Sequence, residues 1–255
     1  IQEGMNLQEN TTDLYLLSLP YNFTTLRQVE GRAWRQGNRH ENVRVNFMLT
    51  NDSIDVFMLQ KLQSKQARYL EAMKKGATSQ SENSNYGRRG TKDYLKLGYV
   101  PLTHHESVNH TLDYAFSDYC ISQVAKQTGD KEISDFYAHQ AKDYQNIFDS
   151  ETGFMRAKDA DGNFRADFLD IRWGRDYAEG SAWQTSWSVL HDFAGLIKLH
   201  GSRENFENKL IELCNQRPNF NVEGYGFEIH EMSEMAAIEF GQVAISNQPS
   251  FHYPY

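Results

Sequence analysis

A single polar stretch divides this chain, and the division constrains its fold more than any other sequence feature. The residues from Lys74 to Asn85 are nearly all small or polar and have no hydrophobic period, as is typical of a linker or junction. The hydrophobic pattern before this stretch differs from the pattern after it. We therefore expect two parts, residues 1–76 and 86–255, with a linker or junction over residues 77–85.

The first part has an α/β pattern. Leu14–Leu19 is a short apolar run suited to a buried strand, and Val43–Leu49 begins with the alternation of a second strand. Residues 51–53 are Asn, Asp and Ser, which favour helix N-termini, so a helix is expected from about Ile54 to Lys74.

The second part has helical periodicity. Apolar residues recur at helical spacing from Val108 to Val124 and again from Ile133 to Phe148, with a break at Thr128-Gly129-Asp130. Two such helices with a tight connection should pack as an antiparallel pair. Further helices are expected over residues 180–200, 203–215 and 232–246.

Composition limits the class of protein. Hydrophobic residues make up 39% of the chain and aromatic residues 13%, which is enough for a folded core and excludes a disordered chain. No apolar run is long enough to cross a membrane, and no signal peptide is expected at the first residues. Cys120 and Cys214 lie among apolar neighbours and are expected to be buried thiols rather than a disulfide.

Charge is distributed unevenly along the chain. The net charge is −8, but residues 1–76 carry a small basic excess and the remainder carries all of the acidic excess. The first part therefore tolerates polyanions, whereas the second does not attract them.

An arginine motif stands out in the first part. Gln28, Gly31-Arg32, Arg35 and Gly37, with Gly4–Gln8 upstream, resemble motifs VI and V of superfamily-2 helicases of the Swi/Snf-related type. The resemblance covers about residues 1–76 and implies the end of a second RecA-like lobe. It implies that Gln28, Arg32 and Arg35 belong to the arginine motif. In a complete helicase Arg32 and Arg35 would stabilise charge on a transferring phosphoryl group.

The helicase resemblance is incomplete. The chain contains no phosphate-binding loop of the G-x-x-x-x-G-K-[ST] type and no acidic pair in a strand. ATP with Mg²⁺, and DNA as a partner, are therefore expected only for a complete helicase. Taken without the upstream motif, Arg32 and Arg35 are better explained as solvated helix residues.

A carboxylate with two tryptophans marks the second part. Glu179, Trp183 and Trp187 are spaced four residues apart, so on a helix they would share one face. A carboxyl group packed against indole rings loses hydration, which favours its neutral, proton-donating form. Tryptophan faces such as that of Trp183 also stack on sugar rings. The structural alternative is a helix N-terminal carboxylate beside two core tryptophans.

A series of motifs gives the second part a family resemblance. In their order along the chain they are similar to glycoside hydrolase family 92: Leu97–Pro101, Glu106–Ala115, Thr152–Arg156, Tyr177–Gln184 and His191-Asp192. The resemblance covers about residues 86–255. It implies a calcium-dependent, inverting exo-α-mannosidase whose catalytic domain is an (α/α)6 barrel. We therefore expect a mainly α chain, with a partial (α/α)6 toroid over 86–255 preceded by a small α/β fragment of a RecA-like helicase lobe.

The resemblance also implies roles for site residues. Glu179 matches the general acid. His230-Glu231 resembles the pair that contacts the leaving-group mannose in α-1,2-specific members, and Asn247 and Gln248 belong to a loop near the sugar and metal. The implied substrate is an α-mannose-containing oligosaccharide of the N-glycan type. Ser181 and Gln248 replace the Asn and Glu of many members, so no calcium ligands are assigned.

A second carboxylate is missing from the matched motifs. Inverting glycosidases place a base about 6.5–9.5 Å from the acid, to activate water. In the family this base lies beyond the stretch that ends at Tyr255, so we expect the chain to be inactive by itself. The mannosidase part is expected to be periplasmic or secreted, and the helicase part cytoplasmic.

Two minor patterns have structural explanations. His104-His105-Glu106 is expected to form a loop before a helix rather than a metal site, because adjacent side chains diverge. Asp159–Asn163 is expected to form a β-turn rather than a calcium loop, because its glycine comes at the fourth position and not the sixth.

Three functional hypotheses remain. The first is an α-mannosidase fragment joined to a helicase tail, by a natural fusion or a misassembled reading frame. The second is a nucleic-acid-dependent ATPase fragment. The third is a carbohydrate-binding remnant that uses Trp183, Trp187 and His230.

Overall fold

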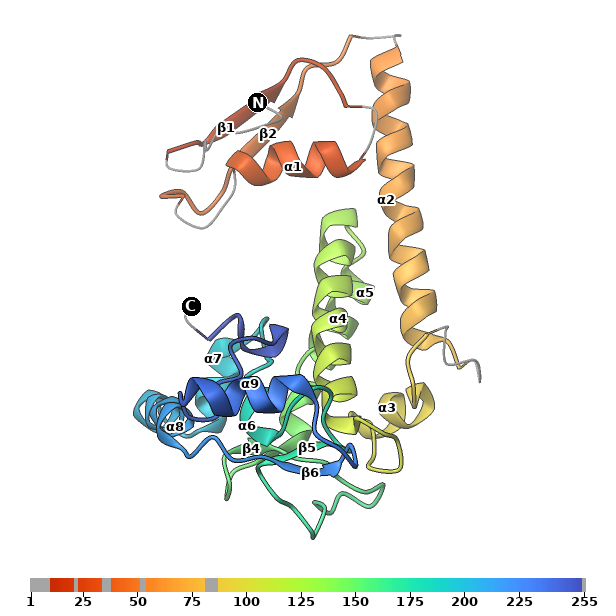
Figure 1. The fold of residues 1–255 in the computed structure, drawn as a ribbon. Helices are drawn as coiled ribbons and strands as arrows, with labels where there is room; N and C mark the ends of the chain where they lie inside the picture. Colours follow the sequence, from red (N-terminus) through yellow and green to blue (C-terminus); the bar gives the residue numbers. More distant parts are fainter. Residues whose placement is uncertain (1–9, 21–22, 34–37, 51–53, 81–86, 254–255) are drawn as a thin grey trace. The chain divides into compact units, whose positions relative to one another are not determined.

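The chain forms two compact units in a computed structural model. The structure describes residues 10–20, 23–33, 38–50, 54–80 and 87–253 (Figure 1). Contacts divide the chain between Ala72 and Met73, which is four residues before the predicted end of the first part. The two units are described separately below.

The first unit has the expected α/β character. Strand β1 (Asp13–Leu16) and strand β2 (Arg44–Phe47) pair in parallel and are connected through helix α1 (Phe23–Ala33). The long helix α2 (Ile54–Thr78) follows, so both strands and this helix are confirmed. A small core forms among buried apolar side chains of β1, α1 and α2, namely Leu14, Leu16, Leu26, Ala33 and Leu62, with partly buried side chains of β2 packed against it. The capping residues 51–53 lie outside the described residues.

Helix α2 continues into the stretch that was expected to be a linker. It ends at Thr78 rather than near Lys74. The buried side chain of Ala77 explains this continuation, because a buried apolar contact stabilises the last helical turn.

The second unit is built on a long helix pair. Helix α4 (Ser107–Thr128) ends at Gly129, whose φ of 81° is a left-handed conformation that glycine adopts readily. The Asp130 side chain then accepts a hydrogen bond from Ile133 N and caps helix α5 (Lys131–Gln140). The two helices pack side by side (Figure 1), which confirms the expected pair, although residues 143–147 form a separate 3₁₀ turn, η1.

The remaining elements of the second unit are short. Helix α3 (Thr91–Leu97) precedes α4. Four short strands follow η1: β3 (Phe148–Asp149), β4 (Phe154–Met155), β5 (Arg172–Gly174) and β6 (Asn221–Gly224). The later helical elements are α6 (Ala182–Thr185), α7 (Phe193–Leu199), α8 (Arg203–Asn215), α9 (His230–Ile238) and the turn η2 (Gln248–Ser250). Strands β3 and β4 pair antiparallel, whereas β5 and β6 pair in parallel. Helical residues greatly outnumber strand residues in this unit, as expected, but the four short strands were not expected.

Two of the expected helices are wrong in extent. Residues 180–200 form α6 and α7 with turns between them, and the helix expected over 232–246 begins at His230 and ends at Ile238. Helix α9 stops there because Glu239 has a φ of 54°, which a continuing right-handed helix does not allow.

An aromatic core and a buried ion pair hold the second unit together. The main core contains Tyr144, Trp183 and Trp187 with aliphatic side chains of α4, α7 and α8. Near α3, the Arg88 guanidinium bonds the Asp118 carboxylate at 2.5 Å, and Tyr94 donates to the same carboxylate at 2.9 Å. Because removing one partner of a buried pair leaves an uncompensated charge, this contact fixes α3 against α4.

The helices and the two cysteines bear on two further expectations. No helix among the described residues has the length and apolar composition needed to cross a membrane. Cys120 and Cys214 are free and partly buried, rather than joined in a disulfide.

Candidate active site

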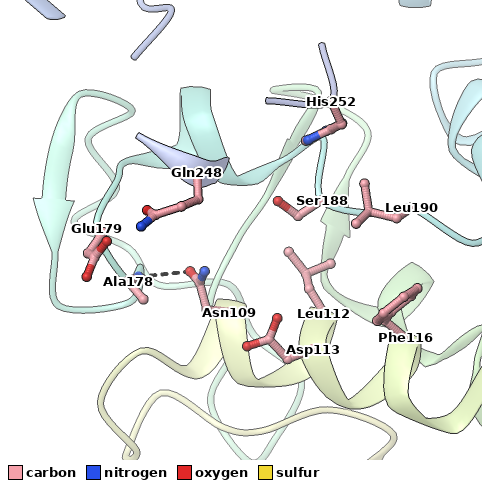
Figure 2. Close-up of a pocket in the computed structure, with 10 residues that line it drawn as sticks. All are labelled: Asn109, Leu112, Asp113, Phe116, Ala178, Glu179, Ser188, Leu190, Gln248 and His252. Atoms are coloured by element: carbon pink, nitrogen blue, oxygen red, sulfur yellow. Dashed lines mark hydrogen bonds between the residues drawn. The ribbon is translucent and has the colours of Figure 1, made fainter. Parts of the chain in front are cut away.

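Glu179 lies at a pocket of the second unit. The pocket has a volume of about 340 Å³ and opens between the N-terminal half of α4, the loop before α6 and the turn η2 (Figure 2). Its polar lining comes from Asn109, Asp113, Glu179, Ser188, Gln248 and His252, and its apolar lining includes Leu112, Phe116 and Leu190. A concave site with a few convergent polar groups is the usual form of a small-ligand site.

Glu179 belongs to a loop and not to a helix. Ser181 is the N-cap of α6: its hydroxyl accepts from Trp183 N, and the Gln184 side chain accepts from Ser181 N in a capping box. The helix therefore begins at Ala182, and Glu179 precedes it with a φ of 47°. This finding corrects the expectation that Glu179, Trp183 and Trp187 share a helix face.

Both tryptophans are core residues. Trp183 is only 2% exposed, and its Nε1 donates to Asp170 at 3.0 Å. The Lys209 ammonium lies over its ring, 4.4 Å from the centroid. Trp187 is equally buried and donates from Nε1 to the carbonyl of Trp183 at 2.7 Å. Neither lines the pocket, so the structure gives no support to the expectation that Trp183 contacts a sugar.

The backbone around Glu179 is bonded by three distant side chains. Asn109 Oδ1 accepts from Ala178 N at 2.9 Å, Tyr225 Oη accepts from Glu179 N at 2.8 Å, and Asn247 Nδ2 donates to the Glu179 carbonyl at 3.0 Å. The Glu179 side chain itself is exposed at the pocket wall. A rigid backbone thus presents a carboxyl group to the pocket.

The rest of the loop is tied to its neighbours. Gly174 N donates to Gly180 O at 3.0 Å and closes the loop at its base. Arg165 binds Asp176 through two hydrogen bonds of 2.7 Å each, which is the planar geometry that guanidinium and carboxylate groups favour. Val108 N donates to Asp176 O at 3.0 Å and joins the loop to the first turn of α4.

Asp113 is the second carboxylate of the pocket wall. It comes from α4, one turn after Asn109, and its side chain lies on the same side of the pocket as Asn109 (Figure 2). Burial raises the pKa of this carboxyl group above its ordinary value, and the nearby charge of Glu106 raises it further.

Asn247 and Gln248 have different placements. Asn247 is 3% exposed, and its amide is used within the protein, because Oδ1 accepts from Gln248 N while Nδ2 holds the Glu179 carbonyl. Gln248 is exposed and lines the pocket. Of the two residues predicted to contact the sugar, Gln248 is thus open to the pocket, whereas Asn247 hydrogen-bonds the loop that carries Glu179.

His230 and Glu231 open helix α9. The His230 side chain is 76% exposed and bonds Glu234 through Nδ1 at 3.1 Å, and its Nε2 is 3.2 Å from Glu231. Neither residue lines the pocket among the described residues. Burial raises the pKa of the Tyr225 phenol above its ordinary value; the hydrogen bond from Glu179 N lowers it, and the charges of Glu106, Glu179 and Glu231 raise it further.

The residues of the arginine motif belong to the first unit. Gln28 is exposed on α1, and Arg32 is half-buried near the end of that helix. Arg35 lies outside the described residues, as do the residues of the upstream motif, Gly4–Gln8. The structure therefore places Gln28 and Arg32 on one helix and leaves the rest of this motif untested.

The two minor patterns adopt the expected local structures. His104, His105 and Glu106 form turns before α4, and His104 Nε2 lies 3.0 Å from Asp93. The Asp159 carboxylate accepts from Asp161 N and Asn163 N, both at 2.9 Å, and closes a turn.

Comparison with known proteins decides the family. The model of the glycosyl hydrolase family 92 catalytic domain matches residues 23–255. The chain belongs to this family. The match also takes in most of the segment that resembles a helicase lobe.

Two solved structures of family 92 enzymes are similar to the chain. One is an inverting mannosidase of Bacteroides thetaiotaomicron, 36% identical with a TM-score of 0.63, over 84% of this chain and 30% of that one. The other is an α-mannosidase of the same organism in complex with mannoimidazole, 30% identical with a TM-score of 0.61, over 76% of this chain and 26% of that one. The chain thus spans about a third or less of these relatives.

Two curated proteins are also similar over part of the chain. An "Uncharacterized secreted glycosidase" of Arthroderma benhamiae is 24% identical over 156 residues, which are 49% of this chain and 20% of that protein. "Defense against restriction protein B" of Escherichia phage P1 is 32% identical over 82 residues, which are 32% of this chain and 4% of that protein. Neither name specifies a helicase.

Metal ligands in this family 92 chain are not assigned from the structure. Calcium takes about six to eight oxygen ligands, which include backbone carbonyls and water. No group of three or more His, Cys, Asp or Glu residues able to hold a metal ion occurs among the described residues.

Two residues of the family 92 site were not predicted. Asn109 lies within the motif Glu106–Ala115, which indicates no role for it, and none of the motifs contains Tyr225. The local signal for Tyr225 is its two flanking glycines, Gly224 and Gly226, because glycine permits close approach of the backbone to neighbouring groups.

Proposed function

We propose that the second unit is the acid-bearing segment of an inverting exo-α-mannosidase, with Glu179 as the general acid. The observation that carries this proposal is the placement of Glu179: an exposed carboxyl group at the wall of a pocket, on a backbone bonded on both sides. Membership of family 92 and similarity to the two Bacteroides mannosidases support the reaction class.

The proposed chemistry follows from the role of an acid. The protonated carboxyl group of Glu179 donates to the glycosidic oxygen as the bond to the anomeric carbon breaks. An inverting reaction also needs a carboxylate that takes a proton from water on the opposite face of the sugar. We assign no described residue to that base, and we therefore expect this chain alone to release no mannose.

The finer specificity remains a proposal from family resemblance. His230 and Glu231 would contact the leaving-group mannose of an α-1,2 linkage in an N-glycan-type oligosaccharide, and Gln248 would contact the sugar in the pocket. A calcium requirement is proposed on the same ground, and no step is assigned to the ion. Export of the enzyme is proposed because a relative is described as secreted.

The test of the acid role compares two leaving groups. In the complete active enzyme, Glu179→Gln should lower kcat on α-1,2-mannobiose by at least about 100-fold, because the poor leaving group needs protonation. An aryl α-mannoside with an activated leaving group should lose far less. Glu207→Gln, which alters an exposed ion pair on α8, is the matched control. Wild-type rates of Glu179→Gln on mannobiose would remove Glu179 from this role.

A second proposal concerns the first unit. We propose that about residues 1–76 derive from a nucleic-acid-dependent ATPase joined to the mannosidase segment. The parallel pair β1–β2 connected through α1, which carries Gln28 and Arg32, favours this origin. The segment would need another lobe to hold ATP and Mg²⁺, so we expect no DNA-stimulated ATP hydrolysis from this chain. DNA-stimulated ATP hydrolysis by this chain would contradict the proposal that its ATP site is incomplete.

A further inference from the structure

We infer that Tyr225 and Asn109 are positioning residues for the general acid. Their side chains hold the backbone of Ala178 and Glu179 in a strained conformation that directs the Glu179 carboxyl group into the pocket. This inference rests on the proposed function of Glu179. It assigns a role to two residues outside the predicted site.

The first observation is backbone strain concentrated at one loop. Four non-glycine residues in the described chain have a positive φ, and three of them, Glu106, Arg175 and Glu179, lie at this loop or bond to it. Glu106 N donates to Arg175 O at 2.8 Å, which joins two of the three. A non-glycine residue rarely adopts the left-handed conformation, which persists only where the surroundings determine it.

The second observation is the pattern of hydrogen bonds that opposes the strain. The N–H groups of Ala178 and Glu179 and the carbonyl of Glu179 are each bonded by a side chain, and those side chains lie 69, 46 and 68 residues away in sequence. A loop residue ordinarily leaves such groups to water. Here they are bonded from three elements, so the loop conformation is set by tertiary contacts.

The third observation is that both anchors are themselves fixed. Tyr225 follows β6, and its ring packs over Gly174, where a Cβ atom would lie 2.7 Å from the ring. Asn109 is in the first turn of α4, directly after Val108, whose N–H bonds the loop at Asp176. Groups held by rigid elements can define an orientation that a free loop would lose.

The first test examines the isolated chain by NMR. Tyr225→Phe removes one hydroxyl oxygen and keeps the ring. We expect hydrogen exchange at the Glu179 amide to become about 10-fold faster, in line with the loss of one net hydrogen bond. The HN–Hα coupling of Glu179, which reports φ, should change as well. Tyr99→Phe is the matched control, because Tyr99 donates at 2.7 Å to Asp159 O in the turn at 159–163.

The second test measures turnover in the complete active enzyme. Tyr225→Phe should lower kcat on α-1,2-mannobiose by about 10-fold with little change in KM, because a misplaced acid protonates poorly. The kcat on an activated aryl mannoside should stay within about 2-fold of wild type, because that leaving group needs little protonation. Asn109→Ala should behave in the same way, and Asn109→Asp, which keeps the acceptor oxygen, should restore part of the rate.

The outcomes separate the two levels of the proposal. Unchanged exchange at Glu179, or equal losses on both substrates, would overturn the positioning role of Tyr225. If Glu179→Gln abolishes turnover of mannobiose while Tyr225→Phe matches wild type, the acid role stands and the positioning inference fails. If Glu179→Gln retains turnover, the proposed function itself fails.

Discussion

At the scale of single residues, the side chain and the backbone of Glu179 have different environments, which a sequence motif does not reveal. Its carboxyl group is exposed to a pocket, while its backbone N–H and carbonyl groups are bonded inside the protein. A proton donor needs both access to the substrate and a defined direction. Trp183 and Trp187 supply neither, because they lie in the core beneath the loop.

A buried histidine offers a residue-scale prediction about pH. His200 stacks on Trp187 with ring centroids 5.9 Å apart, and burial, aided by the charge of Lys209, lowers its pKa to about 4. Between the ordinary value of 6.5 and about 4, the unfolded state binds the proton and the folded state does not. The contribution of His200 to stability therefore falls as the pH falls through this window.

The measurement is the melting temperature of wild type and His200→Phe between pH 7 and pH 4. The variant should lose less stability than wild type over that range. The difference between the two proteins is needed, because burial raises the pKa of Asp143 to about 7 and makes an opposite contribution. Parallel curves for the two proteins would contradict the assignment.

At the scale of elements, one capping box determines that Glu179 lies in a loop before helix α6. The Ser181 hydroxyl and the Gln184 side chain begin helix α6 at Ala182, so the chain before it is free to form the loop of Glu179. Helical spacing alone suggested a helix that included Glu179. Ser181 and Gln184 have the residue types of a capping box, so the start of this helix is visible in the sequence.

Removal of this cap gives an element-scale prediction. Ser181→Ala should destabilise the protein by about 1 kcal/mol, because Trp183 N loses its partner. It should also speed hydrogen exchange at Glu179, since the start of α6 borders the loop. Ser202→Ala removes the matched cap of α8, where the hydroxyl accepts from Asn205 N. The control should lose stability without affecting Glu179; equal exchange in both variants would count against a role for the α6 cap.

At the scale of the whole molecule, each of the two units has a main core of its own. The core of the first unit includes Leu62 of α2, and the core of the second unit includes Leu196 of α7. The division between units falls within α2, close to the polar stretch that divides the sequence. Composition along the chain therefore indicated two parts without indicating that a helix would continue between them.

Separate cores predict two unfolding transitions. Truncation of a buried leucine to alanine should lower the free energy of unfolding by about 2–5 kcal/mol, and only for the unit that contains it. Calorimetry of Leu62→Ala should show a lower first-unit transition and an unchanged second-unit transition, and Leu196→Ala should show the reverse. A single transition shifted by both variants would show that the two units unfold together.

The sequence by itself determined the two-part division, both strands of the first unit, the helix pair α4–α5 and the candidate acid Glu179. These features depend on hydrophobic period, on capping and turn residues, and on local motifs, all of which act over a few residues. Only the tertiary structure decided that Trp183 is core, that Asn247 bonds the Glu179 backbone, and that Asn109 and Tyr225 hold the same loop. The physical reason is range: these hydrogen bonds join residues 46 to 69 positions apart, and packing of the whole unit brings them together.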